Sequence, residues 1–188
     1  MIKLKERIHL AFGEFLAGFL DLCAGIFIVH ILGIIFNKAS ISAADYFLGA
    51  ILAVLPDIDL AYLFLKKGKV EGNHHEIITH RPLIMVPLLA GAGMLFGGAF
   101  WAITAPACLL WHYLHDTEGF GGGGVGWLWP LSKKYYSPFG NCEPHESLSG
   151  SGGSFHAWIK DTWLRPNKQS AIELALGLIF LILVLLIK

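Results

Sequence analysis

The sequence predicts an all-α integral membrane protein, a bundle of about five membrane helices with one long cytoplasmic loop. Hydrophobic residues make up 55% of the 188 residues and charged residues only 15%, whereas a soluble domain carries about a quarter charged residues. Several apolar runs also approach or exceed the length of about 20 residues that a helix needs to cross a bilayer. The length is that of one small bundle, so residues 1–188 are taken as a single membrane domain.

The first apolar run predicts a membrane helix over residues 10–36. Three basic residues precede the run, as in a signal peptide, but it is too long for one and contains Glu14 and Asp21. An uncleaved first helix is therefore expected. Glu14 and Asp21 are seven residues apart and share one helix face, on which they line the bundle interior or pair within it.

A second helix is predicted over residues 43–65, interrupted by Pro56, Asp57 and Asp59. Pro56 has no amide hydrogen to donate and disfavours helical geometry at the residue before it. The chain is expected to open here, which lets both aspartates reach one centre. A carboxylate in the middle of a spanning helix costs roughly 2.5–3.5 kcal/mol, so the pair marks either a functional site or a helix end at the lipid headgroups.

Residues 83–111 are almost wholly apolar and allow two interpretations. A single helix would be about 43 Å long, longer than the hydrocarbon core of about 30 Å. A tight hairpin at Gly97-Gly98 would instead give two helices, 82–96 and 99–117. The hairpin is preferred because paired glycines break helices.

The rest of the chain is a long loop, residues 118–170, and a last helix at 171–187. The glycines at 119–126 lack the Lys-Ser/Thr of a phosphate-binding loop and are interpreted as flexible cover beside the site. Basic residues precede the first helix and occupy the segments 66–81 and 133–168. The positive-inside rule places these segments, and the N-terminus, on the cytoplasmic side of the inner membrane.

Histidines and aspartates fall on that same side. His75 and His80 are five residues apart, and Pro82 predicts a helix start just after His80. His112 and Asp116 are four apart and share a helix face, where they can chelate one ion, bridge two, or form a helix-end hydrogen bond. Imidazole is the commonest metal ligand among side chains. A metal site at the cytoplasmic edge of the bilayer is therefore predicted.

These residues resemble the YdjM-type family of membrane-bound, metal-dependent hydrolases over residues 8 to 135. The resemblance lies in four blocks: His9-x-x-x-Gly13, Leu55-Pro56-Asp57-Ile58-Asp59, His75-x-x-x-Thr79-His80, and His112-x-x-x-Asp116 followed by Trp127-Leu128-Trp129-Pro130-Leu131. The family is distantly similar to zinc-dependent phospholipase C and to fungal single-strand nucleases, which are all-helical enzymes that hold up to three zinc ions.

The resemblance implies a set of metal ligands: His9, Asp57, His75, His80, His112 and Asp116, with Asp59 close by. The chain departs from the family pattern in three places. Leu60 stands where the family often has His, Glu76-Ile77 where it usually has Arg-Gly, and Arg81 where it commonly has Ser. These departures leave the number of ligands and the substrate open.

The first hypothesis is a hydrolase with two or three Zn²⁺ ions that cleaves a phosphoester in a lipid or other amphiphile. Asp57 or Asp59 would orient the attacking water or act as base. Arg81, or Lys133 and Lys134, would bind an anionic group of the substrate. No nucleic-acid partner is expected, because basic and acidic residues number 14 each.

Two other hypotheses use the same residues. Buried His and Asp also mark metal or proton transport pathways, and the cluster can be a structural metal site in a scaffold protein. His145, Glu146 and His156 have no assigned role.

Overall fold

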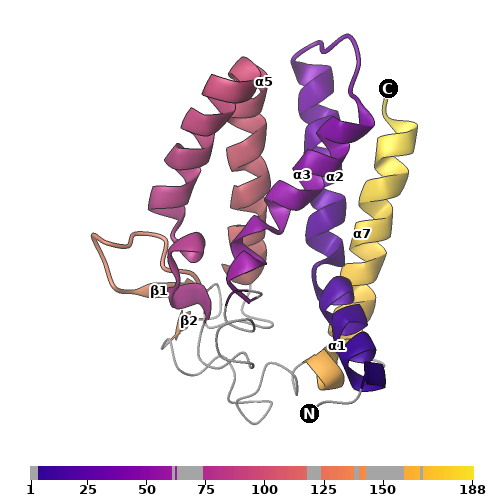
Figure 1. The fold of residues 1–188 in the computed structure, drawn as a ribbon, viewed down its shortest axis with the longest axis vertical. Helices are drawn as coiled ribbons and strands as arrows, with labels where there is room; N and C mark the ends of the chain where they lie inside the picture. The colour runs from indigo at the N-terminus through magenta and orange to yellow at the C-terminus, as the bar shows by residue number, and fades with distance from the viewer. Residues whose placement is uncertain are drawn as a thin grey trace.

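Helices make up nearly all of the regular structure. The computed structural model describes residues 4–60, 62, 74–117, 124–137, 140–142, 159–165 and 167–188. Among these residues, the long helices are α1 (Leu4–Ala17), α2 (Phe19–Ile35), α3 (Ala43–Ala53), α5 (Pro82–Thr117) and α7 (Lys168–Leu186). Short turns are η1 (Leu55–Asp57), η2 (His74–Glu76), η3 (Ile78–His80) and η5 (Ile159–Trp163). Strand β1 (Tyr135–Ser137) pairs antiparallel with β2 (Gly140–Cys142). The chain is therefore an all-α protein with one small hairpin of strands, and Figure 1 shows its N- and C-termini at opposite ends of the bundle.

The first predicted helix is two helices in the structure. α1 and α2 meet at Gly18, and their axes are bent by 43°. Leu10 of α1 is buried against Ile159 and Trp163 of η5. The loop segment that carries η5 thus returns to pack on α1.

The second predicted helix is interrupted at Pro56 as expected, and helical backbone resumes at residues 58–60. Ser42 begins α3 with a capping box, in which its hydroxyl accepts from the amide of Asp45 while the Asp45 carboxylate accepts from the amide of Ser42. α3 then ends at Ala53. Pro56 lies in the tighter turn η1 that follows, because it cannot donate to an α-helical hydrogen bond. Residues 61 and 63–65 of the predicted helix lie outside the described residues.

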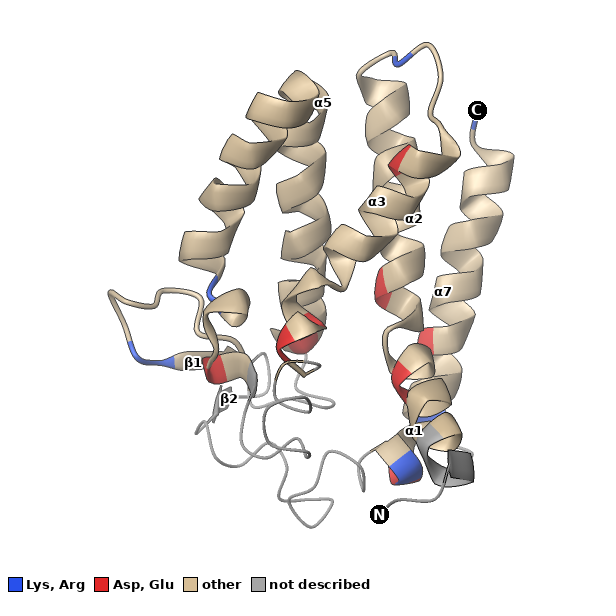
Figure 2. Ribbon diagram, viewed as in Figure 1, with Lys and Arg blue, Asp and Glu red and all other residues tan. Residues whose placement is uncertain are grey.

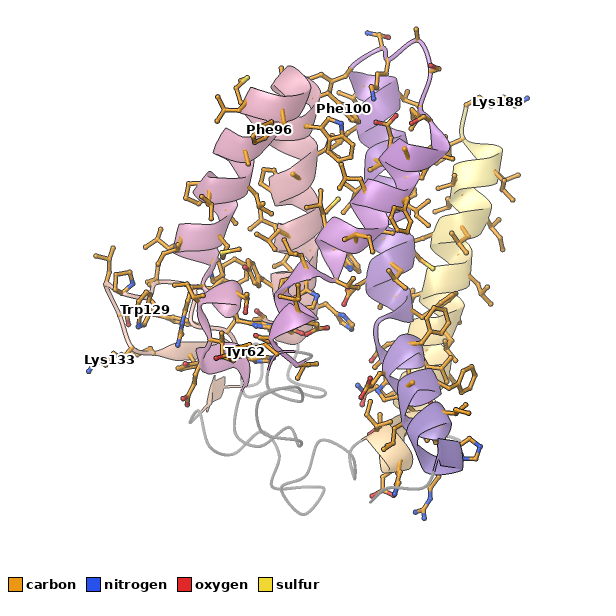
Figure 3. All side chains as sticks on the ribbon, in the orientation of Figure 1. Tyr62, Phe96, Phe100, Trp129, Lys133 and Lys188 are labelled. Atoms are coloured by element: carbon orange, nitrogen blue, oxygen red, sulfur yellow. The ribbon has the colours of Figure 1, made fainter. Side chains whose placement is uncertain are left out.

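α5 turns back on itself at Gly98, whose φ of 70° and ψ of −166° are not helical. A side chain at Gly93 or Gly97 would collide with Trp101, so the glycines let the two arms approach closely. Figure 1 shows the arms lying side by side. The break is at the glycine pair that favoured a hairpin. Phe96, labelled in Figure 3 at the tip, is 90% exposed.

Glycines also set the approach of α2 to its neighbours. A Cβ on Gly25 would collide with the backbone of Gly49 in α3. On the other side of α2, Gly177 of α7 lies against Phe19 and Cys23. Small residues at such crossings allow helices in lipid to pack by van der Waals contact.

By length and composition, α7 can cross a membrane, and the bent pair of α1 and α2 makes another candidate span. α5 also meets this test when its 36 residues are counted end to end, although the chain turns back at Gly98 within it. α3, with 11 residues, is shorter. The fold is thus an all-α membrane protein with two or three candidate spans by this measure, where about five membrane helices were predicted. Most acidic residues gather toward the end of the bundle that holds the N-terminus (Figure 2).

Candidate metal centre

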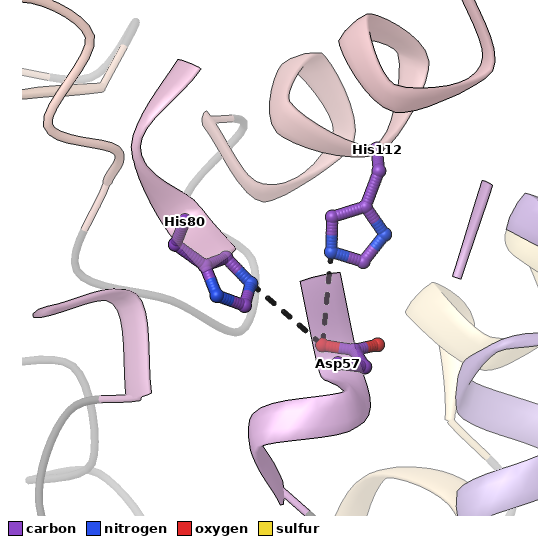
Figure 4. Close-up of side chains that lie close together, drawn as sticks. All are labelled: Asp57, His80 and His112. Atoms are coloured by element: carbon purple, nitrogen blue, oxygen red, sulfur yellow. Dashed lines mark ion pairs between the residues drawn. The ribbon is translucent and has the colours of Figure 1, made fainter. Parts of the chain in front are cut away.

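Three segments that are distant in the sequence meet at this acidic end. Turn η1 supplies Asp57, η3 supplies His80, and the last turns of α5 supply His112. In Figure 4, the Asp57 carboxylate lies between the two imidazoles. Its Oδ1 is 3.8 Å from Nε2 of His80 and 3.6 Å from Nε2 of His112.

Asp116 forms a second meeting point beside the first. Its Oδ2 lies 3.1 Å from Nε2 of His112, 3.3 Å from Nε2 of His80 and 3.6 Å from Nε2 of His75. His112 and Asp116 reach the same place because they are one helical turn apart. A single centre therefore gathers five side chains, those of His75, His80, His112, Asp116 and Asp57.

Two of the imidazoles are anchored by a hydrogen bond from the other ring nitrogen, and the third, His112, faces a carboxylate without a hydrogen bond. Nδ1 of His75 donates to the carbonyl of Gly124 at 2.9 Å, and Nδ1 of His80 donates to Oδ2 of Asp59 at 2.8 Å. Nδ1 of His112 faces Oδ2 of Asp21 at 3.2 Å. Oxygen partners of this kind fix the ring orientation of metal-binding histidines and raise their basicity. All three Nε2 atoms are consequently turned toward Asp57 and Asp116.

Asp59 is itself held in place. It is 2% exposed, and its Oδ2 accepts a hydrogen bond from the Thr79 hydroxyl at 2.6 Å. The Thr79 carbonyl in turn accepts from the Tyr113 hydroxyl at 2.6 Å. Pro82 at the first position of α5 ends the preceding turn and leaves His80 just outside the helix. These contacts make Asp59 a partner of His80 within the centre.

The donors at this centre fit a divalent metal ion. His75, His80 and His112 are at most 2% exposed. Within the described part of the chain, buried Nε2 of His112 and Oδ2 of Asp116 make no hydrogen bond, although such groups are almost always satisfied. Two overlapping groups can hold an ion, Asp57/His80/His112 and His75/His80/Asp116, and in each the ligand atoms lie within 4.8 Å of one another. His80 can ligate only one ion at a time, because its Nδ1 is bonded to Asp59 and its Nε2 has a single lone pair. Imidazole and carboxylate are the usual ligands of catalytic zinc.

The metal-free centre binds a proton at His80. Burial alone would lower the pKa of His80, but the close Asp116 carboxylate, the hydrogen bond to Asp59 and the charges of both raise it to about 9. Without metal, the pairing of protonated His80 with the two carboxylates stabilises the fold. This stabilisation is complete below pH 6.5, the pKa of an unperturbed histidine, and is lost as pH rises through about 9. Metal binding must displace the proton. We expect metal affinity to rise about tenfold per pH unit for this one proton from pH 6.5 toward 9.

The measurement is calorimetric titration with Zn²⁺ at pH 7 in buffers of different ionisation enthalpy, which counts released protons. Asp59→Asn removes one cause of the raised pKa, so proton release in this variant should fall at the same pH. A metal affinity that is flat from pH 6.5 to 8.5 would contradict the assignment of His80 as a ligand.

Comparison with known proteins identifies the family of the chain. The sequence model of one family, YdjM inner membrane protein, matches residues 9–188. The chain belongs to this family. It is similar to inner membrane protein YbcI of Escherichia coli (strain K12), with 38% identity over 106 residues, which cover 50% of this chain. The match covers 58% of the YbcI chain. No solved structure matches.

Other residues of the predicted family site lie apart from this centre. His9 is an exposed residue of α1 and belongs to neither of the two ligand groups. Lys133 and Lys134 are exposed in the segment before β1, and Figure 3 shows Lys133 pointing away from the helices. His145, Glu146 and His156 lie outside the described residues.

Arg81 is buried, and it contacts the segment that follows α5. Its Nη2 donates to the Glu76 carbonyl at 2.7 Å and to the Tyr135 hydroxyl at 3.0 Å. Its guanidinium also lies over the rings of Trp129 and Tyr135, at 5.2 and 5.4 Å from their centroids. These contacts fasten the segment 124–137 that supplies the Gly124 carbonyl to His75.

Three residues of the site had no firm role in the sequence. They form a chain of contacts on α2, α5 and α7, in which Asp21 contacts His112, His115 contacts Asp21, and Glu173 contacts His115. Glu173 stands in the last apolar run, as Asp21 does in the first. A carboxylate within an apolar helix predicts a specific partner, and this signal points to both residues.

Proposed function

We propose that the protein is a membrane-embedded, metal-dependent hydrolase that holds two or three Zn²⁺ ions and cleaves a phosphoester in a lipid or other amphiphile. The observation that carries the proposal is the convergence of three imidazoles and two carboxylates at one buried point. The resemblance to zinc-dependent phospholipase C and the fungal nucleases supports the phosphoester chemistry.

The five donors have separate roles in the proposal. His75, His80, His112 and Asp116 would hold metal. Bound zinc would lower the pKa of a coordinated water and stabilise negative charge on the reacting group. The side chain of Asp57 is 32% exposed, whereas those of the histidines are nearly inaccessible. Asp57 is therefore the donor best placed to accept a proton from the attacking water at the edge of the centre.

Apolar side chains beside the centre support an amphiphilic substrate. Ile58, next to Asp57, is 58% exposed, and Tyr62 is 53% exposed. Acyl chains can pack on such surfaces while a headgroup reaches the carboxylates. The family description and the basic segments support a location in the inner membrane with the site facing the cytoplasm.

The end of the bundle opposite the metal centre favours a hydrolase over a transporter. A transporter needs polar groups along a path through the bilayer. His30 of α2 stands nearer that end. Its Nδ1 bonds to the Tyr46 hydroxyl and its Nε2 donates to the Ile187 carbonyl, both at 2.8 Å. Both ring nitrogens are thus engaged in holding α2, α3 and α7 together.

The test is metal analysis of the purified protein with stoichiometry, followed by assays on phosphodiesters and phospholipid vesicles. We expect two or three zinc ions per chain and zinc-dependent release of a phosphoester product. In His112→Ala and Asp116→Ala, activity should fall by more than about 100-fold, beyond the 10–100-fold typical of losing a partner outside the ligand shell.

The matched control is Asp161→Asn, which removes an exposed carboxylate that pairs with Arg165 at the same end of the bundle. Its activity should equal that of the wild type. Unchanged activity in both ligand variants would reject the mechanism. Zinc uptake into liposomes that is lost in His80→Ala would show a transporter instead.

A further inference from the structure

A buried polar network continues from His112 away from the metal centre. The Asp21 carboxylate of α2 is 3% exposed and uses both oxygens. Its Oδ2 faces Nδ1 of His112 at 3.2 Å. Its Oδ1 accepts hydrogen bonds from Nδ1 of His115 at 3.0 Å and from Nε1 of Trp111 at 2.8 Å. Two donors thus hold one oxygen of Asp21 and leave the other for His112.

Glu173 of α7 closes the network on its far side. Its Oε2 lies 3.4 Å from Nε2 of His115, as an ion pair without a hydrogen bond, and its Oε1 accepts from the side-chain amide of Gln169 at 2.9 Å. Glu173 is 8% exposed and is the only charged residue between Lys168 and Lys188. A buried carboxylate is costly in an apolar helix unless it is paired, and its partner here is the histidine that holds Asp21.

We propose that Glu173 is a positioning residue for the metal centre, acting through His115 and Asp21 on His112. Glu173 fixes the His115 ring from one side, so the opposite nitrogen stays aimed at Asp21. Asp21 then keeps Nδ1 of His112 engaged and Nε2 turned toward Asp57 and Asp116. The inference rests on the metal site of the proposed function and is independent of which bond the protein hydrolyses.

α7 also packs on α2 through contacts that do not involve Glu173. Gly177 packs against Phe19 and Cys23, and the rings of Phe27 and Phe180 stack with centroids 5.0 Å apart. Glu173 is therefore not the sole attachment of α7 to α2. This separation between helix packing and the polar chain makes the role of Glu173 testable.

The experiment titrates Co²⁺ and Zn²⁺ into the full-length chain purified in detergent, and follows the visible Co²⁺ absorption bands. In Glu173→Ala we expect roughly tenfold weaker binding, at the low end of the effect of an outer hydrogen-bond partner, and shifted Co²⁺ bands. Glu173→Gln should restore most of the affinity, because its amide oxygen can still accept from His115. Glu173→Leu, which suits an apolar helix, replaces Glu173→Ala if the latter does not insert.

The packing control is Gly177→Ala, whose new methyl group would press on Phe19 without touching the polar network. It should lower the melting temperature and leave the Co²⁺ bands in place. In a double-mutant cycle, Glu173→Ala should add little to Asp21→Asn, since both act on His112 by one route.

Additive effects in that cycle, unshifted Co²⁺ bands in the Glu173 variants, or shifted bands in Gly177→Ala would each overturn the positioning role. Absence of metal binding by the wild-type chain would instead refute the metal site of the proposed function. The wild-type titration and the variant comparison therefore separate the two failures.

Discussion

The His80→Ala protein should insert into the membrane and bind Zn²⁺ at least about 100-fold more weakly than the wild type, a larger loss than that of an outer hydrogen-bond partner. In the wild type, His80 belongs to both overlapping groups that can hold an ion, so the substitution removes a donor from whichever group is occupied. Its Nδ1 is already bonded to Asp59 and offers no second ligand atom. Equilibrium dialysis with zinc, followed by elemental analysis of the protein, measures the loss.

Two variants calibrate this result. Asp59→Asn keeps the His80 ring but weakens its anchor, and should lower zinc affinity by about 10–100-fold. His30→Ala removes a partly buried histidine whose contacts lie with Tyr46 and Ile187, away from the centre, and should bind zinc as the wild type does. Wild-type zinc affinity in His80→Ala would show that the histidines gather for a reason other than metal.

The second large effect concerns stability. Gly25→Ala should destabilise the folded bundle by about 1–3 kcal/mol, the usual cost of overpacking, and Gly25→Leu by more. The added atoms would meet the backbone of Gly49 and Ala50, which cannot move aside as a flexible side chain can. Thermal unfolding of the purified protein in detergent measures the change.

Gly91→Ala is the matched control, because it adds the same methyl group to a glycine of another membrane helix where nothing lies within 4 Å. Alanine favours the helix over glycine by up to about 1 kcal/mol, so this variant should be as stable as the wild type or more so. Equal melting temperatures for Gly25→Ala and Gly91→Ala would mean that α2 and α3 do not pack through these glycines.

Features governed by local backbone chemistry could be predicted from the sequence. The low charge content predicted a membrane protein, because lipid excludes charged side chains. Pro56 predicted the interruption after α3, and the pair Gly97-Gly98 predicted the turn in α5. Each follows from what one or two residues do to their own backbone. The bend at Gly18 was missed, since a single glycine within an apolar helix is a weak signal.

The ligand types and most members of the group could be predicted, but not every member or role. The motifs nominated His9 together with His80 and His112, yet His9 is exposed on α1 while the other two are buried at the centre. Arg81 resembled a substrate-binding cation in the sequence, whereas its buried guanidinium contacts Tyr135 and Trp129. Spacing along a chain does not reveal which side of a helix faces a distant segment.

By itself, the sequence determined the lipid environment, the sites where helices break, and a supply of imidazoles and carboxylates toward one end of the bundle. Only the tertiary structure decided how closely Asp57, His80 and His112 meet. It also decided that Asp59 accepts a hydrogen bond from His80, and that Glu173 contacts His115. The physical reason is that propensities and hydrophobicity act over a few residues, whereas each contact at the centre joins segments tens of residues apart and depends on how closely the helices pack.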